Sequence, residues 1–422
     1  MTAGKKAEYS NLAKTYRDHA EKEKRILLVI SVFRFLTFAG GLIIVWLSFT
    51  LSKYYGFAVL LFVSGIFIYL LKIYSDHLAR QQYLSDLELI NLNEVRASEG
   101  DYSVFGDGSS FGLKSHDFSY DTDLFGQGSL FQFLNRTCTG YGSEVLAGWL
   151  ADPYILAPFL KSRQQTISEL AAKLTWRQSF LATGINKDLN SRNIKGLTKW
   201  LSEETEISSY GFKKVILWIF PLLACVSLLL TSIGSLHYSV FILIFLVNLL
   251  IILLNLKNTQ SIHGELSGRY NFLSSLGSLL ELIENEQFES PLIGKIKEDI
   301  KVSRLSAVRA LKQLSNIIRA FDSRLNLIVG FVLNGLLLWD LHCIRKIESW
   351  KADYRGHFPG WLDLLGQTDA FISLGNYSYN NPEFVFPEFA DDKAPFRAKQ
   401  LGHPLIAHDT RVCNDFSIPS KG

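Results

Sequence analysis

The sequence predicts a mainly α-helical protein with two hydrophobic helical hairpins and, at its end, the start of a β-containing domain. Two further helical regions are expected, which we call the core (residues 124–212) and the lever (residues 258–350). Four long runs with few charged residues predict four membrane spans, because about 20 apolar residues cross the hydrocarbon of a bilayer. Elsewhere, apolar residues at steps of three and four predict amphipathic helices. Beyond residue 350 these patterns give way to mixed structure, punctuated by Trp361, Pro382 and Pro387.

The composition agrees with a membrane protein. Hydrophobic residues make up 48% of the 422 residues, a large share for a soluble protein, and the apolar runs explain it. The net charge of +3 is too small to indicate nucleic-acid binding by itself. The four cysteines lie far apart without zinc-site spacing, which favours free thiols in a reducing compartment.

Residues 1–25 form a basic lead without a cleavable signal pattern. A positive excess beside a membrane span marks the cytoplasmic side, so we expect an amphipathic or disordered cytoplasmic lead, with a nucleic-acid arm as the alternative. The first hairpin, residues 26–71, has spans 26–51 and 54–71 around Lys53. We expect Arg34, within the first span, to snorkel towards the cytoplasmic end rather than to mark an ion path.

Residues 72–123 are expected to continue as a charged helix and then to form an irregular connector rich in Gly, Ser and Asp. The connector holds four residues of metal-binding type, but their spacing matches no known ligand loop, so we predict no metal site. These four are His116, Asp117, Asp121 and Asp123.

The core, residues 124–212, begins with two short predicted helices around a polar elbow, residues 137–139. Thr139 is the expected N-cap of the second helix, and Pro153 ends it. Each helix has one apolar cluster: Leu130, Phe131, Phe133 and Leu134 in the first, and Val145, Leu146, Trp149 and Leu150 in the second.

The second hairpin, residues 213–257, has a connection without Lys or Arg, whereas Lys213, Lys214 and Lys257 flank its other side. With the first hairpin, this charge distribution predicts a multi-pass protein of the plasma (inner) membrane whose N-terminus and both large domains are cytoplasmic. We expect Asn248, within the last span, to be a buried structural amide that bonds a neighbouring helix.

The lever, residues 258–350, has a coiled-coil-like apolar seam. Its members are Val308, Leu311, Leu314, Ile318, Phe321, Leu325 and Ile328. A basic face on the same helix is a candidate for contacts with DNA phosphates, although we favour a simply solvated face. We assign Lys301, Arg304, Lys312 and Arg319 to it. Residues 327–339 are apolar but too short for a span, which predicts a buried helix.

Two segments closely resemble the core signature of the MutS family of DNA mismatch-repair ATPases. The first, residues 129–153, is similar to S-L-F-x-x-L-N-x-T-x-T-x-x-G-x-x-x-L-x-x-W-L-x-x-P. The second, from Arg163-Gln164 to Leu170, is similar to R-Q-x-x-I-x-x-L, which follows it in the family. Residues 334–341, N-G-L-L-L-W-D-L, resemble the approach to the lever in membrane-anchored MutS-like chains. The resemblance implies a MutS-like core and lever.

Residues 351–422 resemble the first part of the MutS ATPase domain. Leu401-Gly402-His403-Pro404 is similar to its opening element, and residues 411–416 to its F-I-x-N-D strand. The resemblance implies that Arg411, Val412 and Asn414 lie on the adenine side of the nucleotide, with Arg411 where the family has an aromatic residue that stacks on the base.

The complete family member uses ATP and Mg²⁺, but G-x-x-x-x-G-K-[ST] and the Walker B strand do not occur in this sequence. We therefore expect no catalysis and no bound cofactor from this chain alone, which leaves open whether it acts as an enzyme. The mismatch-reading domain of the family is also missing, and the second hairpin takes the place of its DNA clamp.

We thus predict a membrane-anchored MutS-like protein with ATP-dependent binding of mismatched DNA, and a role in mismatch repair, in its complete form. The membrane, a second copy in a homodimer and, by resemblance, DNA are the expected partners, with no small-molecule substrate. The alternative is a membrane scaffold that self-associates through its helical core without ATPase or DNA activity. A transporter is disfavoured because the spans hold almost no ionisable residues.

Overall fold

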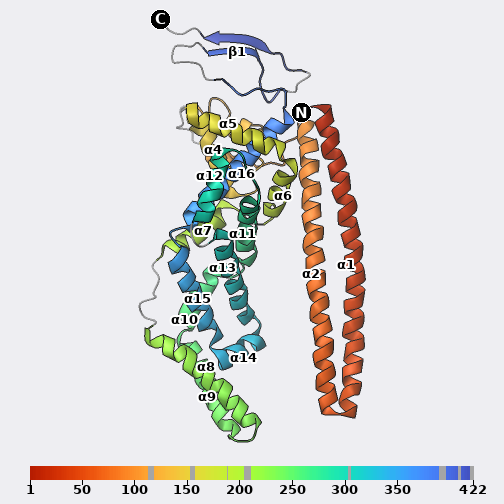
Figure 1. The fold of residues 1–422 in the computed structure, drawn as a ribbon, viewed down its shortest axis with the longest axis vertical. Helices are drawn as coiled ribbons and strands as arrows, with labels where there is room; N and C mark the ends of the chain where they lie inside the picture. Colours follow the sequence, from red (N-terminus) through yellow and green to blue (C-terminus); the bar gives the residue numbers. More distant parts are fainter. Residues whose placement is uncertain are drawn as a thin grey trace. The chain divides into compact units, whose positions relative to one another are not determined.

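The computed structural model describes residues 1–112, 118–152, 157–187, 189–203, 211–302, 306–388, 396–406 and 410–418. Helices dominate these ranges, and the two described strands pair near the carboxyl end (Figure 1). The mainly helical prediction is therefore confirmed. The chain divides into two compact units: unit 1 comprises residues 1–134, 173–182 and 376–422, and unit 2 comprises residues 135–172 and 183–375.

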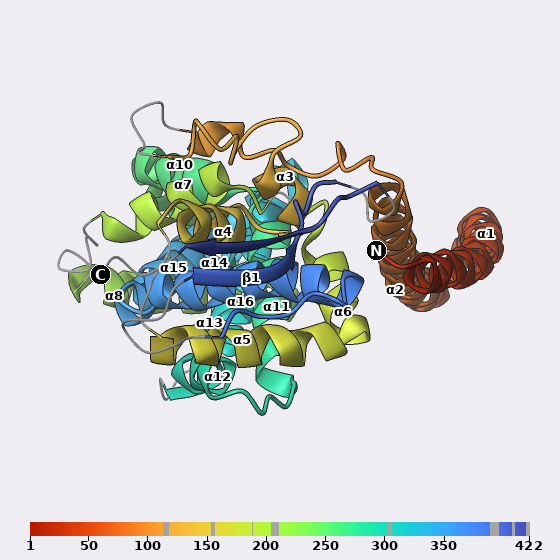
Figure 2. The ribbon, with the colours of Figure 1, turned by 90° about the horizontal axis from the view of Figure 1, so that it is seen from above.

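Two long helices make up most of unit 1. Helices α1 (Ala3–Leu51) and α2 (Lys53–Ser98) are antiparallel partners separated only by the extended Ser52, and Figure 2 shows them as a pair seen almost end-on. The basic lead is thus the first half of α1, and the disordered alternative is wrong. Its buried positions, which include Tyr9, Ala13 and Ala20, recur at helical spacing and face α2.

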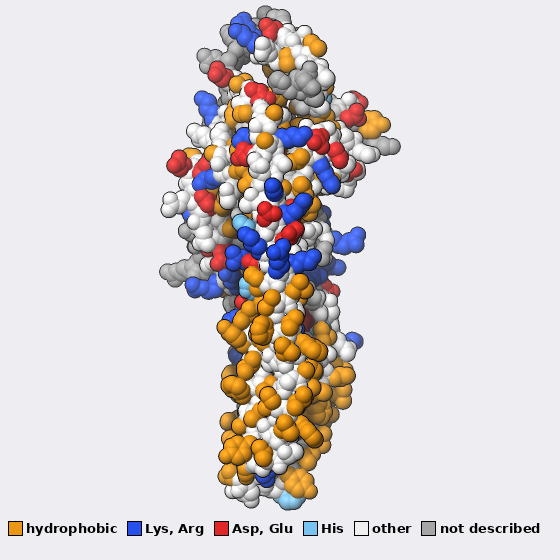
Figure 3. All heavy atoms as spheres, turned by 90° about the vertical axis from the view of Figure 1, so that its right-hand side faces the viewer, with side chains coloured by type: hydrophobic (Ala, Val, Ile, Leu, Met, Phe, Trp, Pro, Cys, Tyr) orange, Lys and Arg blue, Asp and Glu red, His pale blue; other side chains and the backbone are white. Residues whose placement is uncertain are grey.

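The distal half of this hairpin has its large apolar side chains outside. Phe35 and Trp46 on α1 and Leu61 on α2 are each about 70% exposed, whereas Gly41 and Gly56 are buried between the helices. Figure 3 shows this apolar surface, with Lys and Arg side chains gathered where it ends. Small residues inside and large apolar residues outside are typical of helices packed in lipid.

The other elements of unit 1 are shorter than α1 and α2. A connector with the 3-10 helix η1 (Ser109–Phe111) leads to α3 (Leu130–Leu134), where Phe131 and Leu134 are buried as predicted. Helix α6 (Leu174–Gly184) belongs mainly to this unit. Strand β1 (Phe396–Leu401) pairs antiparallel with β2 (Asn414–Ile418), and the register shifts between Ala398 and Leu401, where Gln400 has a φ of 51°.

Unit 2 is helical throughout its described residues. Helices α4 and α5 lie on either side of α16 (Figure 2), and α11, α13 and α15 form the lever bundle. Its elements are α4 (Gly140–Ala151), α5 (Ala157–Ala172), α7 (Ser191–Ser202), α8 (Gly211–Ser232), α9 (Tyr238–Leu254), α10 (Leu256–Leu266), α11 (Tyr270–Asn285), α12 (Pro291–Val302), α13 (Ala307–Asp322), η3 (Ser323–Leu325), α14 (Leu327–Leu337), α15 (Trp339–Tyr354) and α16 (Phe358–Asn380), the last five residues of which count with unit 1.

The apolar seam of the lever is confirmed on α13 and ends there. Its members from Val308 to Phe321 are buried and face α11 and α15. Leu325 and Ile328 are 68% and 76% exposed instead, because α13 ends at Asp322 and α14 turns from it by 110°. The expectation of a seam that runs through residue 328 is therefore wrong.

Helical structure also continues well past residue 351, where the sequence predicted mixed structure. Helix α15 runs to Tyr354, and α16 adds 23 further residues up to Asn380. Trp361 is 4% exposed within α16, where the apolar positions recur at helical spacing, so it is a core residue and does not interrupt the helix.

The four apolar runs are all helical. By length and composition, α1, α2 and α8 are each able to cross a membrane, and the described residues allow up to five spans if two bent helix pairs are counted. One bent pair is α9 with α10, at 64°, and the other is α13 with α14. The coarse prediction of several apolar helices that are able to span a membrane is confirmed.

Candidate functional site

The polar elbow, residues 137–139, closes around one buried carboxylate of α16 in unit 2. Asp369 is 0% exposed, and its oxygens accept hydrogen bonds from the backbone N–H (2.9 Å) and hydroxyl (2.6 Å) of Thr139. The N–H of Cys138 donates to the same carboxylate at 3.2 Å. The hydroxyl of Thr139 also accepts from the N–H of Gly142, so the predicted N-cap is confirmed.

Burial and hydrogen bonding have opposite effects on the pKa of Asp369. Burial raises its pKa to about 6, although the hydrogen bonds from Thr139 and Cys138 act to lower it. The carboxylate also faces the amino end of α4, where the helix dipole favours negative charge. This approach requires a glycine at residue 142, because a Cβ there would come within 2.2 Å of the carboxylate.

Other residues of the core signature have structural roles in the same joint. Asn135 accepts hydrogen bonds from the N–H and hydroxyl of Thr137, which hold the elbow in shape. The guanidinium of Arg163 lies 4.1 Å from the ring centre of Trp149, and that ring packs on Phe371 at 4.6 Å. The two parts of the signature, 129–153 and 163–170, therefore meet through these side chains.

Cys138 sits at the elbow but is not arranged as a nucleophile. Burial raises its pKa well above 9, and the adjacent Asp369 raises it further, so the thiol stays protonated at neutral pH. A Cβ at residue 184 would lie 2.3 Å from its sulfur, which shows how closely the chain surrounds it. Cys138 is thus a packing residue of the joint.

A second polar network, in unit 1, holds the first turns of α1. The hydroxyl of Tyr9 donates to Asn380 at 2.9 Å, and the carboxylate of Glu94 on α2 accepts from the amides of Asn376 and Asn380, each at 3.0 Å. Arg177 on α6 donates to Asn376 at 3.3 Å. Four helices therefore meet at buried polar groups.

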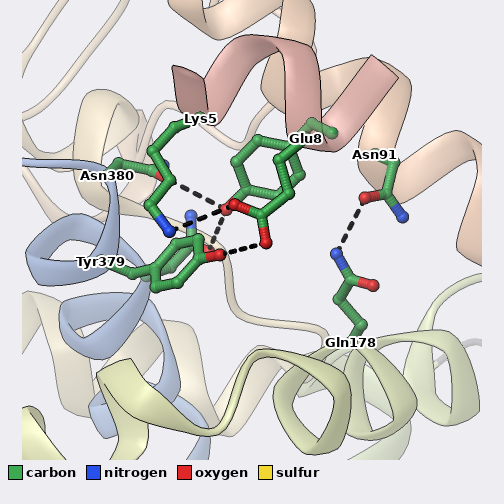
Figure 4. Close-up of polar contacts among 8 residues, drawn as sticks. Lys5, Glu8, Asn91, Gln178, Tyr379 and Asn380 are labelled. Atoms are coloured by element: carbon green, nitrogen blue, oxygen red, sulfur yellow. Dashed lines mark hydrogen bonds and ion pairs between the residues drawn. The ribbon is translucent and has the colours of Figure 1, made fainter. Parts of the chain in front are cut away.

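Figure 4 shows the outer part of this network. The Lys5 ammonium lies 3.4 Å from the ring centre of Tyr379 and 3.2 Å from Glu8, and the Tyr379 hydroxyl donates to Glu8 at 2.7 Å. Beside it, Gln178 donates to Asn91 at 2.9 Å. Sequence reasoning missed this network, because bonded members such as Tyr9 and Asn380 lie 371 residues apart and match no local pattern.

Two of the four residues proposed for DNA contacts have partners within the chain. The Lys312 ammonium pairs with Glu281 of α11 at 2.7 Å, and the Arg319 guanidinium lies over the ring of Tyr270, also on α11, at 5.1 Å. Lys301 lies in α12, apart from α13, and Arg304 falls outside the described residues. Lys312 and Arg319 each contact α11.

The residues expected near adenine lie in and before β2. Arg411 lies over the ring of Phe384 at 4.9 Å, Val412 is 79% exposed, and Asn414 opposes Leu401 in the sheet. The Arg411 guanidinium thus stacks on a ring of its own chain, next to Gly402. Of the connector residues of metal-binding type, His116 and Asp117 fall outside the described residues.

Two polar residues of the apolar runs contact neighbouring helices. The Arg34 guanidinium lies 4.6 Å from the ring centre of Tyr74 on α2. Asn248 is completely buried, and its amide donates to the carbonyl of Gly335 on α14 at 2.8 Å. The predicted structural role of Asn248 is confirmed, and its neighbouring helix is α14.

Helix α14 is not the buried helix that its length predicted. Its buried face is small or polar, with Gly330, Asn334 and Gly335, and packs on α8 and α9. Its large side chains face outwards, since Leu327 is 87% and Phe331 56% exposed. This inverted pattern is that of α1 and α2 and is typical of lipid-facing helices.

Comparison of the chain with protein-family models, with curated proteins and with solved structures gave no match.

Proposed function

We propose that this chain is a membrane-anchored MutS-like protein whose complete form binds ATP and DNA. The observation that carries this proposal is the core signature, because its anchors are spread over some 40 residues in the order and spacing of the family. Their structural roles support it: Thr139 caps α4, Gly142 admits Asp369, and Trp149 packs on Arg163. A chance match of letters would not be expected to form one continuous joint.

The hairpin α1–α2, the hairpin α8–α9 and the outer face of α14 are the proposed membrane anchor. Their exposed apolar side chains would cost free energy in water, at about 25 cal/mol for each square ångström of apolar surface. The positive lead and the Lys residues around the second hairpin then orient the N-terminus and the large helical regions towards the cytoplasm. In this arrangement, ATP-driven dimerisation in the complete protein would move the lever bundle relative to the anchor.

The proposal is tested with the full-length protein, as its gene encodes it, purified in detergent. We expect saturable ATP binding and retention of duplex DNA that depends on nucleotide, with a mismatched duplex retained better than a matched one. Equal retention of both duplexes would mean that the protein binds DNA but does not recognise mismatches. The absence of both ATP binding and DNA retention would refute the proposal.

A membrane scaffold that self-associates through the lever is the second candidate. One observation favours it: Lys312 and Arg319 are engaged by Glu281 and Tyr270 within the bundle, which suits a structural role better than phosphate contacts. Cross-linking of the full chain in membranes, without nucleotide, separates the two functions. Dimers that form independently of ATP and DNA support the scaffold, whereas monomers exclude it.

A further inference from the structure

Residues of α8, α14 and α15 line an open pocket of about 470 Å³ in unit 2; Figure 1 labels these three helices. Its walls combine two tryptophans, Trp218 and Trp339, with three side chains of α15 that carry or accept a positive charge. These are His342, Arg345 and Lys346, and Ser349 adds a hydroxyl at the edge. Apolar walls with a few convergent polar groups are the usual composition of a small-ligand site.

The pocket lies where the apolar surface of the second hairpin begins. The candidate span of α8 starts at Val215, and Trp218 in its first turn is 65% exposed. Tryptophan is enriched at the boundary between hydrocarbon and headgroups, because its ring is apolar and its N–H is polar. The outward face of α14, with Leu327 and Phe331, extends the apolar surface beside α8. A molecule in the pocket can therefore keep acyl chains in the bilayer.

The positive charge of the pocket favours a lipid with an anionic headgroup. Arg345 is half-buried and Lys346 is exposed, and neither forms an ion pair with any residue in the described ranges. Both cations act on His342, where burial and these positive charges lower the pKa. An anion in the pocket would relieve this repulsion. Arg and Lys together bind phosphate oxygens through directed N–H bonds and through charge.

The ring of His342 is held in one orientation at the pocket wall. Its Nε2 lies 2.9 Å from the carbonyl oxygen of Leu217, so the proton is on Nε2 and Nδ1 is left for the other side of the ring. The ring also stands edge-on to Trp218, with their centres 5.5 Å apart. Trp339 is fixed separately, because its indole N–H donates to the carbonyl of Ala320 at 2.9 Å.

We propose that this pocket binds the phosphate of an anionic phospholipid headgroup, with Arg345 and Lys346 as its counter-ions and Trp218 at the acyl boundary. Basic pockets beside membrane helices on the cytoplasmic side bind such headgroups elsewhere. Because α15 belongs to the lever bundle, a bound lipid would join the bundle directly to the membrane. The inference rests on insertion of α8 in a bilayer, which is part of the proposed function, and not on ATP or DNA binding.

The test is native mass spectrometry of the full chain in detergent micelles, with added phosphatidylglycerol, phosphatidylcholine, inorganic phosphate or a short duplex DNA. We expect phosphatidylglycerol to be retained at roughly tenfold lower concentration than phosphatidylcholine. Inorganic phosphate and DNA should not displace it at matched phosphate concentration. The double variant R345Q/K346Q should weaken retention by about tenfold to thirtyfold, since each basic residue near an anionic surface contributes about a factor of five.

The matched control is R192Q/K199Q, which removes one exposed Arg and one exposed Lys from α7 and should change retention less than twofold. A second variant, S349E, keeps both cations and adds a negative charge at the pocket edge, and it should also weaken retention, whereas S349Q should not. Equal binding of the two lipids, full binding by R345Q/K346Q and S349E, or displacement by phosphate or DNA would overturn the proposal. None of these readouts requires nucleotide, so failure here is distinct from failure of the proposed function.

Discussion

The hydroxyl of Thr139 donates a 2.6 Å hydrogen bond to the carboxylate of Asp369, which lies 230 residues later in the chain. This contact ties the amino end of α4 to the middle of α16. Asp369 is therefore a hydrogen-bond partner of the core signature, although it lies outside the residues of the signature. The elbow is held in this geometry by an acceptor that α16 supplies.

Replacing Asp369 by asparagine should destabilise unit 2 by about 1–3 kcal/mol, because the new amide nitrogen would face N–H donors and leave them unpaired. Thermal unfolding of the purified chain measures the effect. The matched control is D363N on the same helix, where an exposed carboxylate bonds only Gln367, and it should be almost neutral. Equal melting temperatures for the two variants would contradict the role of Asp369.

The pH dependence of the same variant has a defined sign. Burial raises the folded-state pKa of Asp369 from 3.8 to about 6, so between these values the folded state binds more protons than the unfolded state. The contribution of Asp369 to stability is therefore greatest below about pH 4, declines as the pH rises to about 6, and is then constant. The decline corresponds to roughly 3 kcal/mol. The stability difference between wild type and D369N, measured from pH 4 to 8, should follow this curve, and an increase with pH would contradict it.

In unit 1, Y9F should loosen the start of α1. The change removes the hydroxyl that donates to Asn380 inside a network that also contains Glu94, at an expected cost of about 1–2 kcal/mol. Hydrogen exchange of the amides in the first four turns of α1 should become faster. The control is Y120F, at an exposed tyrosine of the same unit, which should leave exchange unchanged. Unaltered protection in Y9F would show that the network does not hold the helix.

The sequence predicted those parts of the fold that depend on local spacing. Thr139 as an N-cap, the seam around Leu314 and the burial of Asn248 follow from periodicity and capping chemistry, which a single segment carries. The α1–α16 contacts could not be predicted, because Tyr9 and Asn380 are brought together only by the tertiary fold. The outward face of α14 was also missed, since a short, mostly apolar segment looks the same in sequence whether its large side chains face protein or lipid.

The joint between α14 and α15 provides a test of backbone strain. Leu338 is fully buried yet has a φ of 50°, a left-handed conformation that is costly for a residue with a Cβ. Both L338A and L338G remove the buried side chain, at about 2–5 kcal/mol. Glycine also relieves the strain, so L338G should be more stable than L338A by about 1 kcal/mol, the reverse of the usual order in helices. Thermal unfolding of both variants decides this, and the usual order would show that residue 338 is not left-handed.

Helix α8 lacks one backbone hydrogen bond of a regular helix. Pro221 has no N–H, so the carbonyl of Leu217, four residues earlier, lacks its normal helical donor, and His342 of α15 donates to it instead at 2.9 Å. H342A should therefore destabilise the wild-type chain by about 1–2 kcal/mol. In the P221A background the new N–H can bond Leu217, and the same change should cost about 1 kcal/mol less. A double-mutant cycle of thermal stabilities measures this coupling, and strictly additive effects would mean that His342 does not replace the bond that proline removes.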